Sequence, residues 1–259
     1  MQQEKIQVEI LQRVGILTIN NPPANALTPE LRDEFSEKLS RISKDDDVWT
    51  LIVTGAGEKF FMAGANIPGL LQLDRDSGLK RVQDTRKFFS QLDYFEKPVI
   101  AAINGLCLGG GLELALVCDI RIAADHVKLG LPEVNLGLIP GAGGTQRLPR
   151  AIPLGWANQL LFTGEAILAE KALEIGLVQQ VVPLTSLREA ALELAGKING
   201  KGPLAVRAAK KASSTGLSLT LEQGLDIENQ AFSEVCATQD KNEGITAFLE
   251  KRKPMFQGK

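Results

Sequence analysis

Two glutamates in this chain stand in contexts that suit acid–base chemistry. Glu113 follows three consecutive glycines, and Glu133 follows a proline in the next motif along the chain. Addition of water to a double bond needs one group that takes a proton from water and another that delivers a proton to carbon. Neighbouring carboxyl groups do both when desolvation and like-charge repulsion separate their pKa values. For either glutamate alone, a solvated surface role or a capping role is the more common explanation.

The glycines before Glu113 form a candidate site for negative charge. Gly109, Gly110 and Gly111 lead from an apolar segment into Leu112-Glu113-Leu114-Ala115, so backbone amides should gather at a helix N-terminus with no side chain in the way. Such amides, helped by the helix dipole, stabilise negative charge on a thioester oxygen when a nucleophile attacks the conjugated β-carbon or when a base removes an α-proton. The alternative is that the glycines only permit close packing of a helix on a sheet.

A second glycine-rich turn, residues 60–67, could supply a further amide, because an oxyanion hole requires two converging donors. A plain strand-to-helix turn is its simpler explanation. The later run Gly141-Ala142-Gly143 has Gln146 where a dinucleotide fingerprint needs its last glycine, so a Rossmann site is set aside.

The remaining reactive side chains do not indicate another chemistry. His126 is the single histidine of the sequence, has no serine or cysteine arranged around it, and is expected at the surface. Cys107 and Cys118 have apolar neighbours, which favours packed, inert thiols. Three widely spaced cysteines without a CxxC pair predict neither a disulfide framework nor a zinc site.

The composition is that of an ordinary globular protein. The 259 residues are 44% hydrophobic and 23% charged, with a formal net charge of -2, so the chain has no general attraction to nucleic acid or anionic lipid. No signal-peptide pattern and no apolar stretch of membrane-spanning length is present. These features predict a cytoplasmic protein with no membrane partner.

The elements that must position the glutamates follow an α/β pattern. Thr28-Pro29 should begin a helix, with Leu31, Phe35, Leu39 and Ile42 on its apolar face. A second helix is expected over residues 79–93. The expected strands are Ile6–Leu11, Gly15–Ile19, Trp49–Val53, Val99–Ile103, Ile120–Ala123 and Leu177–Val182. Helical periodicity dominates after Thr185, which predicts a core over residues 1–195 and a helical region over 196–259.

Taken in order, the motifs of the whole chain resemble the crotonase (enoyl-CoA hydratase/isomerase) superfamily, and within it the bacterial enoyl-CoA hydratases of fatty-acid oxidation. The resemblance rests on NPPANAL, FMAGANI, KPVIAAINGLCLGGGLELALVCDIRIA, LPEVNLGLIPGAGGTQRLPR, TGE, GLVQQVVP and FLEKRKP. It implies an α/β fold, a right-handed ββα spiral core with a C-terminal helical trimerisation region, and a homotrimer or homohexamer.

The resemblance also implies roles for individual residues. The amides of Ala65 and Gly110 would form the oxyanion hole, and the amide of Gly141 would hold the attacking water. Glu133 would protonate the α-carbon of a trans-2-enoyl thioester, while Glu113 would hold and help deprotonate the water, giving syn hydration. The residues expected to contact the substrate or its coenzyme A are Ala24, Ala63, Asn66, Ile67 and Pro68. No metal and no cofactor is implied, since coenzyme A is part of the substrate.

Two positions depart from the family pattern. Asn66 replaces the usual aspartate, and Pro68 replaces a commonly basic residue. The resemblance therefore leaves the details of coenzyme A binding and the acyl-chain preference open, while both catalytic positions are intact. The basic run Lys251-Arg252-Lys253 would lie near a coenzyme A phosphate of a neighbouring subunit, or simply mark a charged helix end.

Other functions stay open at this point. An enoyl-CoA isomerase, or a hydratase of a branched or unusual acyl-CoA, is the nearest alternative, although the presence of both glutamates favours hydration. A non-catalytic scaffold or RNA-binding homologue is the alternative from another class. The slightly acidic charge and the 5% aromatic content disfavour nucleic acid as a partner.

Overall fold

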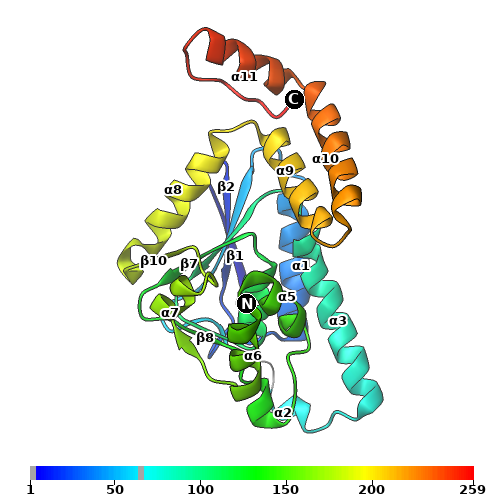
Figure 1. The fold of residues 1–259 in the computed structure, drawn as a ribbon. Coiled ribbons are helices and arrows are strands. Elements are labelled where there is room, and N and C mark those ends of the chain that lie inside the picture. Colours follow the sequence, from blue (N-terminus) through cyan, green and yellow to red (C-terminus); the bar gives the residue numbers. More distant parts are fainter. Residues whose placement is uncertain (1–3, 64–66) are drawn as a thin grey trace.

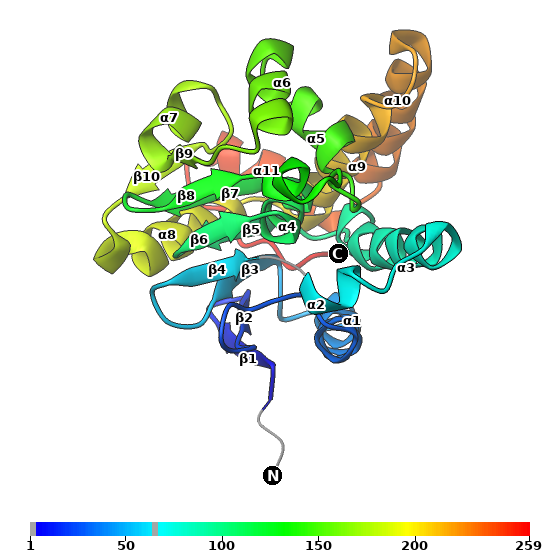
Figure 2. The same cartoon turned by 90° about the horizontal axis from the view of Figure 1, so that it is seen from below.

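The computed structural model describes residues 4–63 and 67–259, and in this part of the chain the strands form two sheets (Figures 1 and 2). The first sheet has the order β1-β2-β3-β5-β7-β10, with β1 antiparallel to β2 and the later pairs parallel. Its strands are β1 (Ile6–Leu11), β2 (Val14–Ile19), β3 (Thr50–Gly55), β5 (Val99–Ile103), β7 (Ile120–Ala124) and β10 (Gln180–Val182). The second sheet has the order β4-β6-β8-β9. Its strands are β4 (Phe60–Ala63), β6 (Leu106–Leu108), β8 (Lys128–Gly130) and β9 (Ile167–Leu168).

The chain winds through both sheets in repeated turns. Figure 2 shows the pairs β3 and β4, β5 and β6, and β7 and β8 stacked in successive layers. Each turn adds one strand to each sheet before a helical segment leads to the next turn. These helical segments are α2 (Ile67–Leu70), α3 (Arg75–Asp93), α4 (Gly110–Val117), η1 (Pro132–Leu136) and α5 (Gly144–Ala151). The expected ββα spiral is therefore confirmed.

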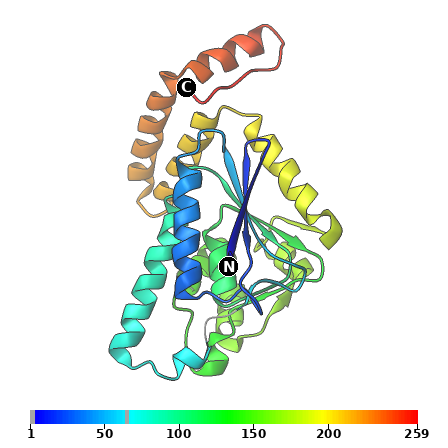
Figure 3. The ribbon, with the colours of Figure 1, turned by 180° about the vertical axis from the view of Figure 1, so that it is seen from behind.

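Helix α1 (Pro29–Ser43) begins where the sequence predicts. The Thr28 side chain accepts a hydrogen bond from the amide of Leu31 at 3.2 Å, and the predicted apolar face is buried. Phe35 on this face meets Phe88 of α3 edge to face, with ring centroids 5.1 Å apart. Figure 3 shows α1 in blue beside α3 in cyan. Each fully buried apolar side chain contributes roughly 1.5–3 kcal/mol, which fixes α3 against the core.

Two predicted elements differ from the structure by more than two residues at one end. The strand expected over Leu177–Val182 begins only at Gln180, because the amides of Leu177 and Val178 both donate to the carbonyl of Ala172 in the turn after α7 (Ala169–Glu174). The first two residues of that apolar run therefore serve a helix end rather than the sheet.

The helix expected over residues 79–93 begins earlier, at Arg75. Asp74 and Ser77 cap it reciprocally: the amide of Ser77 donates to Asp74 Oδ1 at 2.9 Å, and the amide of Asp74 donates to Ser77 Oγ at 3.0 Å. A capping box of this kind satisfies the donors that a helix start leaves open. The added turn extends α3.

Helices dominate the last quarter of the chain. Helix α8 (Leu187–Asn199) packs on β2, β3, β5 and β7, so residue 195 lies within a helix of the core. Figure 1 shows α9 and α10 side by side, with α11 at the end away from the sheets. Lys210 ties α9 to the core by donating to the carbonyl of Lys97 at 2.9 Å and to Asp119 at 2.7 Å. The bounds of these helices are Pro203–Gly216 for α9, Leu221–Cys236 for α10 and Gln239–Leu249 for α11.

The remaining elements are α6 (Leu154–Thr163) and η2 (Leu184–Ser186). Among the helices that the structure describes, none combines the length and apolar character needed to cross a membrane. The division into residues 1–195 and 196–259 stays a prediction.

Candidate active site

Helix α4 lies at the centre of the candidate site. It contacts β4, β6, α3 and α5, and Leu112, Leu114 and Ala115 are fully buried in it. Gly109 precedes the helix with a φ of +57°, a conformation that side chains rarely allow. Because the helix begins at Gly110, the amides of its first turn have no acceptor within the helix.

Gly111 allows α4 to approach β4 very closely. A Cβ atom on Gly111 would lie 1.8 Å from the carbonyl oxygen of Met62. The packing explanation for the glycine run is thus correct for Gly111. It also places the start of α4 beside the end of β4 at Ala63, after which comes the segment expected to carry the second oxyanion donor.

The change Gly111→Ala should destabilise the fold because the obstructing atom belongs to the backbone. We expect the free energy of unfolding to fall by about 3 kcal/mol, the upper part of the range for overpacked cores. The matched control is Gly155→Ala in α6, where a Cβ meets nothing within 4 Å. Urea unfolding of both variants measures the effect, and equal midpoints for the two would contradict the proposed clash.

Glu113 projects from the first turn of α4 into a buried environment. Glu113 is only 3% exposed. Its Oε1 atom accepts hydrogen bonds from the amides of Ala142 at 2.7 Å and Gly144 at 2.8 Å. Burial raises the pKa of this carboxyl, while the two amides and the guanidinium of Arg147 oppose that shift. The amide hydrogen bonds therefore favour charge on Glu113.

Glu133, in η1, has a contrasting environment. Its Oε2 atom is buried and has no hydrogen-bond partner among the described residues. Desolvation raises the pKa of Glu133 to about 7, with a further contribution from the charge of Glu113, so the two carboxyl groups lie within electrostatic reach. A Cβ on Gly109 would lie 2.9 Å from Glu133 Oε1, which shows that the glycine run leaves room for this carboxyl. Glu133 is the carboxyl that more readily keeps a proton.

The other glycines expected in the site lie around these glutamates. Gly110 is the first residue of α4. Gly141 is exposed, and a Cβ there would lie 2.7 Å from Cγ1 of Val82 in α3, so α3 borders the turn expected to hold water.

The expected substrate contacts Ala24 and Ala63 lie next to each other. The amide of Ala63 donates to the carbonyl of Ala24 at 3.0 Å. Asn25 strengthens the junction, since its side-chain amide donates to the carbonyls of Phe60 at 3.1 Å and Phe61 at 3.2 Å. The predicted residues Ala65 and Asn66 lie outside the described part of the chain, and Ile67 and Pro68 begin α2.

Sequence reasoning missed the groups that hold Glu113. It assigned the Gly141 amide to water but did not anticipate that the amides of Ala142 and Gly144 bind the carboxylate. It also missed Arg147, which pairs with Asp93. The four-residue run Gly141–Gly144 was the available signal, because glycines expose backbone amides to a neighbouring anion.

The residues set aside as non-catalytic lie where expected. His126 is exposed, while Cys107 and Cys118 are buried and burial raises the pKa of both thiols. Within the described residues, no group of three or more histidine, cysteine, aspartate or glutamate side chains is arranged to hold a metal ion. In the basic run near the C-terminus, Arg252 forms ion pairs with Glu243 and Glu250.

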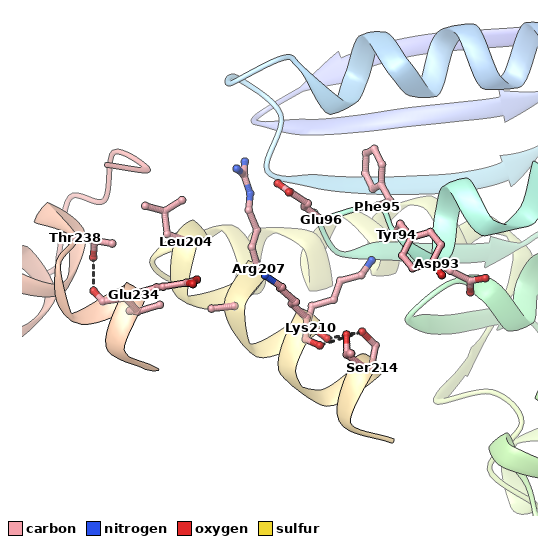
Figure 4. A pocket seen from close by; sticks show the side chains of 14 residues that line it. Asp93, Tyr94, Phe95, Glu96, Leu204, Arg207, Lys210, Ser214, Glu234 and Thr238 are labelled. Carbon is pink, nitrogen blue, oxygen red and sulfur yellow. Dashed lines mark hydrogen bonds between the residues drawn. The ribbon is translucent and has the colours of Figure 1, made fainter. Parts of the chain in front are cut away.

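A pocket of about 490 Å³ lies apart from the glutamates, between the end of α3 and helices α9 and α10 (Figure 4). Charged side chains of both signs line it, including Glu96, Arg207, Lys211 and Glu234. None of the residues predicted to form the active site lines this pocket. We therefore place the candidate chemistry at Glu113 and Glu133 and not here.

Comparison with known proteins identifies the family of the chain. Residues 9–259 match the family model described as Enoyl-CoA hydratase/isomerase. The chain is 43% identical over 254 residues to the short-chain-enoyl-CoA hydratase of Clostridium acetobutylicum, covering 98% of this chain and 97% of that protein. It is 45% identical over 260 residues to the crotonyl-CoA hydratase of Syntrophomonas wolfei, covering 100% of both. The crystal structure of an enoyl-CoA hydratase from Bacillus anthracis superposes with a TM-score of 0.94 at 44% identity, covering 99% of this chain and 100% of that one. The chain therefore belongs to the enoyl-CoA hydratase/isomerase family.

Proposed function

We propose that this protein is a hydro-lyase, an enoyl-CoA hydratase that adds water syn across the double bond of a trans-2-enoyl-CoA to give a 3-hydroxyacyl-CoA in fatty-acid oxidation. The observation that carries the proposal is the contrast between the two carboxyl groups. Glu113 accepts two amide hydrogen bonds that favour its ionised form, whereas Glu133 has an unpartnered buried oxygen, within the described structure, and a pKa of about 7. One base and one acid in reach of each other are what hydration requires.

In the proposed reaction, Glu113 accepts a proton from water as the water oxygen bonds to the β-carbon. The electrons of the double bond move toward the thioester carbonyl, and Glu133 delivers its proton to the α-carbon. Proton transfer from Glu113 back to Glu133 restores both groups. The amide of Gly141 is proposed to orient the water, because it adjoins the turn that binds Glu113.

The charge that develops on the thioester oxygen needs its own donors. We propose the amides of Gly110 and Ala65 for this role. The position of Gly110 at the start of α4 supports its role, since the amides of a first helical turn have no acceptor within the helix. The close approach of Gly111 to Met62 supports the role of Ala65, because it brings the end of β4, which precedes Ala65 in the chain, next to α4. Ala24, Ala63, Asn66, Ile67 and Pro68 are proposed to contact the acyl thioester or coenzyme A.

A substrate panel tests this function. Purified protein is mixed with trans-2-enoyl-CoA thioesters of increasing chain length, and loss of the conjugated-thioester absorbance is followed, with the 3-hydroxyacyl product identified by mass spectrometry. We expect turnover that survives prior dialysis against EDTA, because neither carboxyl role needs a metal. Conversion of 3-enoyl-CoA to 2-enoyl-CoA without hydration would instead establish an isomerase, and salt-dependent RNA retention without any thioester turnover would establish the binding homologue.

We also propose a homotrimer or homohexamer. Large apolar side chains are exposed on the C-terminal helices and the turn before α10, which is typical of a surface covered by another subunit. They include Leu217, Leu221, Phe232, Phe248 and Leu249.

A further inference from the structure

A charged pair joins α3 to α5 next to the proposed base. Arg147 of α5 donates to both carboxylate oxygens of Asp93, the last residue of α3, from Nη1 at 2.9 Å and from Nη2 at 2.6 Å. Each side chain is 29% exposed, so the pair is largely removed from water. Two parallel hydrogen bonds of this kind fix the plane of a guanidinium as well as its position.

The same guanidinium lies against the turn that holds Glu113. A Cβ on Gly143 would lie 2.9 Å from Nε of Arg147, and Gly143 has a φ of +112° that requires glycine. The carbonyl of Gly143 in turn accepts the amide of Arg147 at 2.7 Å. Gly143 stands between Ala142 and Gly144, the two residues whose amides bind Glu113. Arg147 thus contacts the middle of the turn whose two flanking amides hold the carboxylate.

We propose that Arg147 is a positioning residue for the reaction: anchored on Asp93, it holds the Ala142–Gly144 turn so that both amides reach Glu113, and it supplies positive charge beside that carboxylate. Arg147 acts through Glu113 and does not touch the reacting atoms. The inference rests on the proposed function, since it assumes that Glu113 is the base for water.

The charges around Glu113 determine in which direction its pKa should move when Arg147 is replaced. In the described part of the chain, Glu113 interacts electrostatically with Arg147 of α5 and Glu133 of η1, and Asp93 of α3 pairs with Arg147. The positive charge of Arg147 lowers the pKa of Glu113 against the effect of burial. Loss of that charge should raise this pKa, so that a higher pH is needed to ionise the base.

Four variants separate the roles of Arg147. Arg147→Met removes both the charge and the paired hydrogen bonds to Asp93. Arg147→Lys keeps the charge but cannot form the two parallel hydrogen bonds of a guanidinium. Asp93→Asn keeps the shape of the partner but leaves the charge of Arg147 unbalanced. Arg150→Met is the matched control, because Arg150 is an exposed arginine on the same helix whose guanidinium bonds Gln146.

We expect Arg147→Met to lower kcat by about 10- to 100-fold with a much smaller change in KM. A small displacement of Glu113 from the attacking water would slow the reaction without weakening substrate binding. The acidic limb of its pH profile should move to higher pH. Arg147→Lys should return the limb toward the wild-type position while recovering only part of kcat. Asp93→Asn should move the limb to lower pH, and Arg150→Met should resemble wild type throughout.

A double-mutant cycle distinguishes positioning from general structural support. In a Glu113→Gln background, Arg147→Met should cost little further activity, because the group it acts through has already lost its charge. An equal loss in both backgrounds, an unmoved acidic limb, or wild-type kinetics for Arg147→Met would each overturn the inference. A wild-type protein that hydrates no enoyl-CoA would overturn the proposed function instead.

Discussion

Replacement of Glu133 by glutamine should reduce kcat for hydration by about 100- to 10,000-fold, the usual contribution of a positioned acid or base. Glutamine keeps the size of the side chain but has no proton to give to the α-carbon. The buried, unpartnered Oε2 of Glu133, within the described structure, accepts no hydrogen bond whose loss would loosen the fold. Steady-state kinetics on the best substrate of the panel measure the loss, with circular dichroism as a check on folding.

The pH profile supplies a second measurement on this residue. Because the proposed role of Glu133 requires its protonated form and its pKa is about 7, kcat/KM should fall as the pH rises through that region. The limb belongs to the interacting pair of carboxyls, and it should be absent from Glu133→Gln. The control is Glu189→Gln on the exposed surface of α8. A variant at Glu133 that keeps wild-type turnover and the alkaline limb would remove the acid assignment.

Local signals predicted the long elements well. Thr28 and Pro29 defined the start of α1, and the spacing of apolar residues identified the face that is buried in it. The glycines before Glu113 likewise predicted a helix start, and α4 begins at Gly110. These features depend on neighbours in the sequence, so periodicity and capping rules apply to them directly.

The second sheet could not be read in the same way. Its strands β6, β8 and β9 span three, three and two residues, too short for a period-2 pattern to be recognised. They are strands because the chain returns to the same layer on each turn of the spiral. Pairing between distant segments, rather than intrinsic preference, therefore determines them.

The hydrogen bonds and charges around Glu113 could not be predicted from the sequence for a related reason. Asp93 and Arg147 are separated by 54 positions, and the amide of Ala142 lies 29 positions from Glu113. Nothing in either segment alone indicates the other. Only the packing of α4 against α3 and α5 brings Glu113, the amide turn and the charged pair together.

Replacement of Glu113 by glutamine should lower activity without lowering stability. Without a negative charge to accept the proton from water, kcat should fall by about 100- to 10,000-fold. The glutamine oxygen still accepts hydrogen bonds from Ala142 and Gly144, so the turn keeps its partner. A catalytic charge held in a buried place is a common source of such a trade-off between activity and stability.

The sign of the stability change follows from linkage. Burial raises the pKa of Glu113 in the folded state, so its favourable contribution is present below the ordinary pKa and is lost as the pH rises through the raised value. Above that value the wild-type protein carries a buried charge that Glu113→Gln does not. Above the raised pKa the free energy of unfolding of the variant should equal or exceed that of wild type. It should also decline less than that of wild type as the pH is raised from the ordinary pKa of a glutamate through the raised value. Urea unfolding across this range, with Glu189→Gln beside it, measures both. A variant that is markedly less stable than wild type above the raised pKa would mean that the carboxylate supports the fold, and its loss of activity would then no longer identify a base.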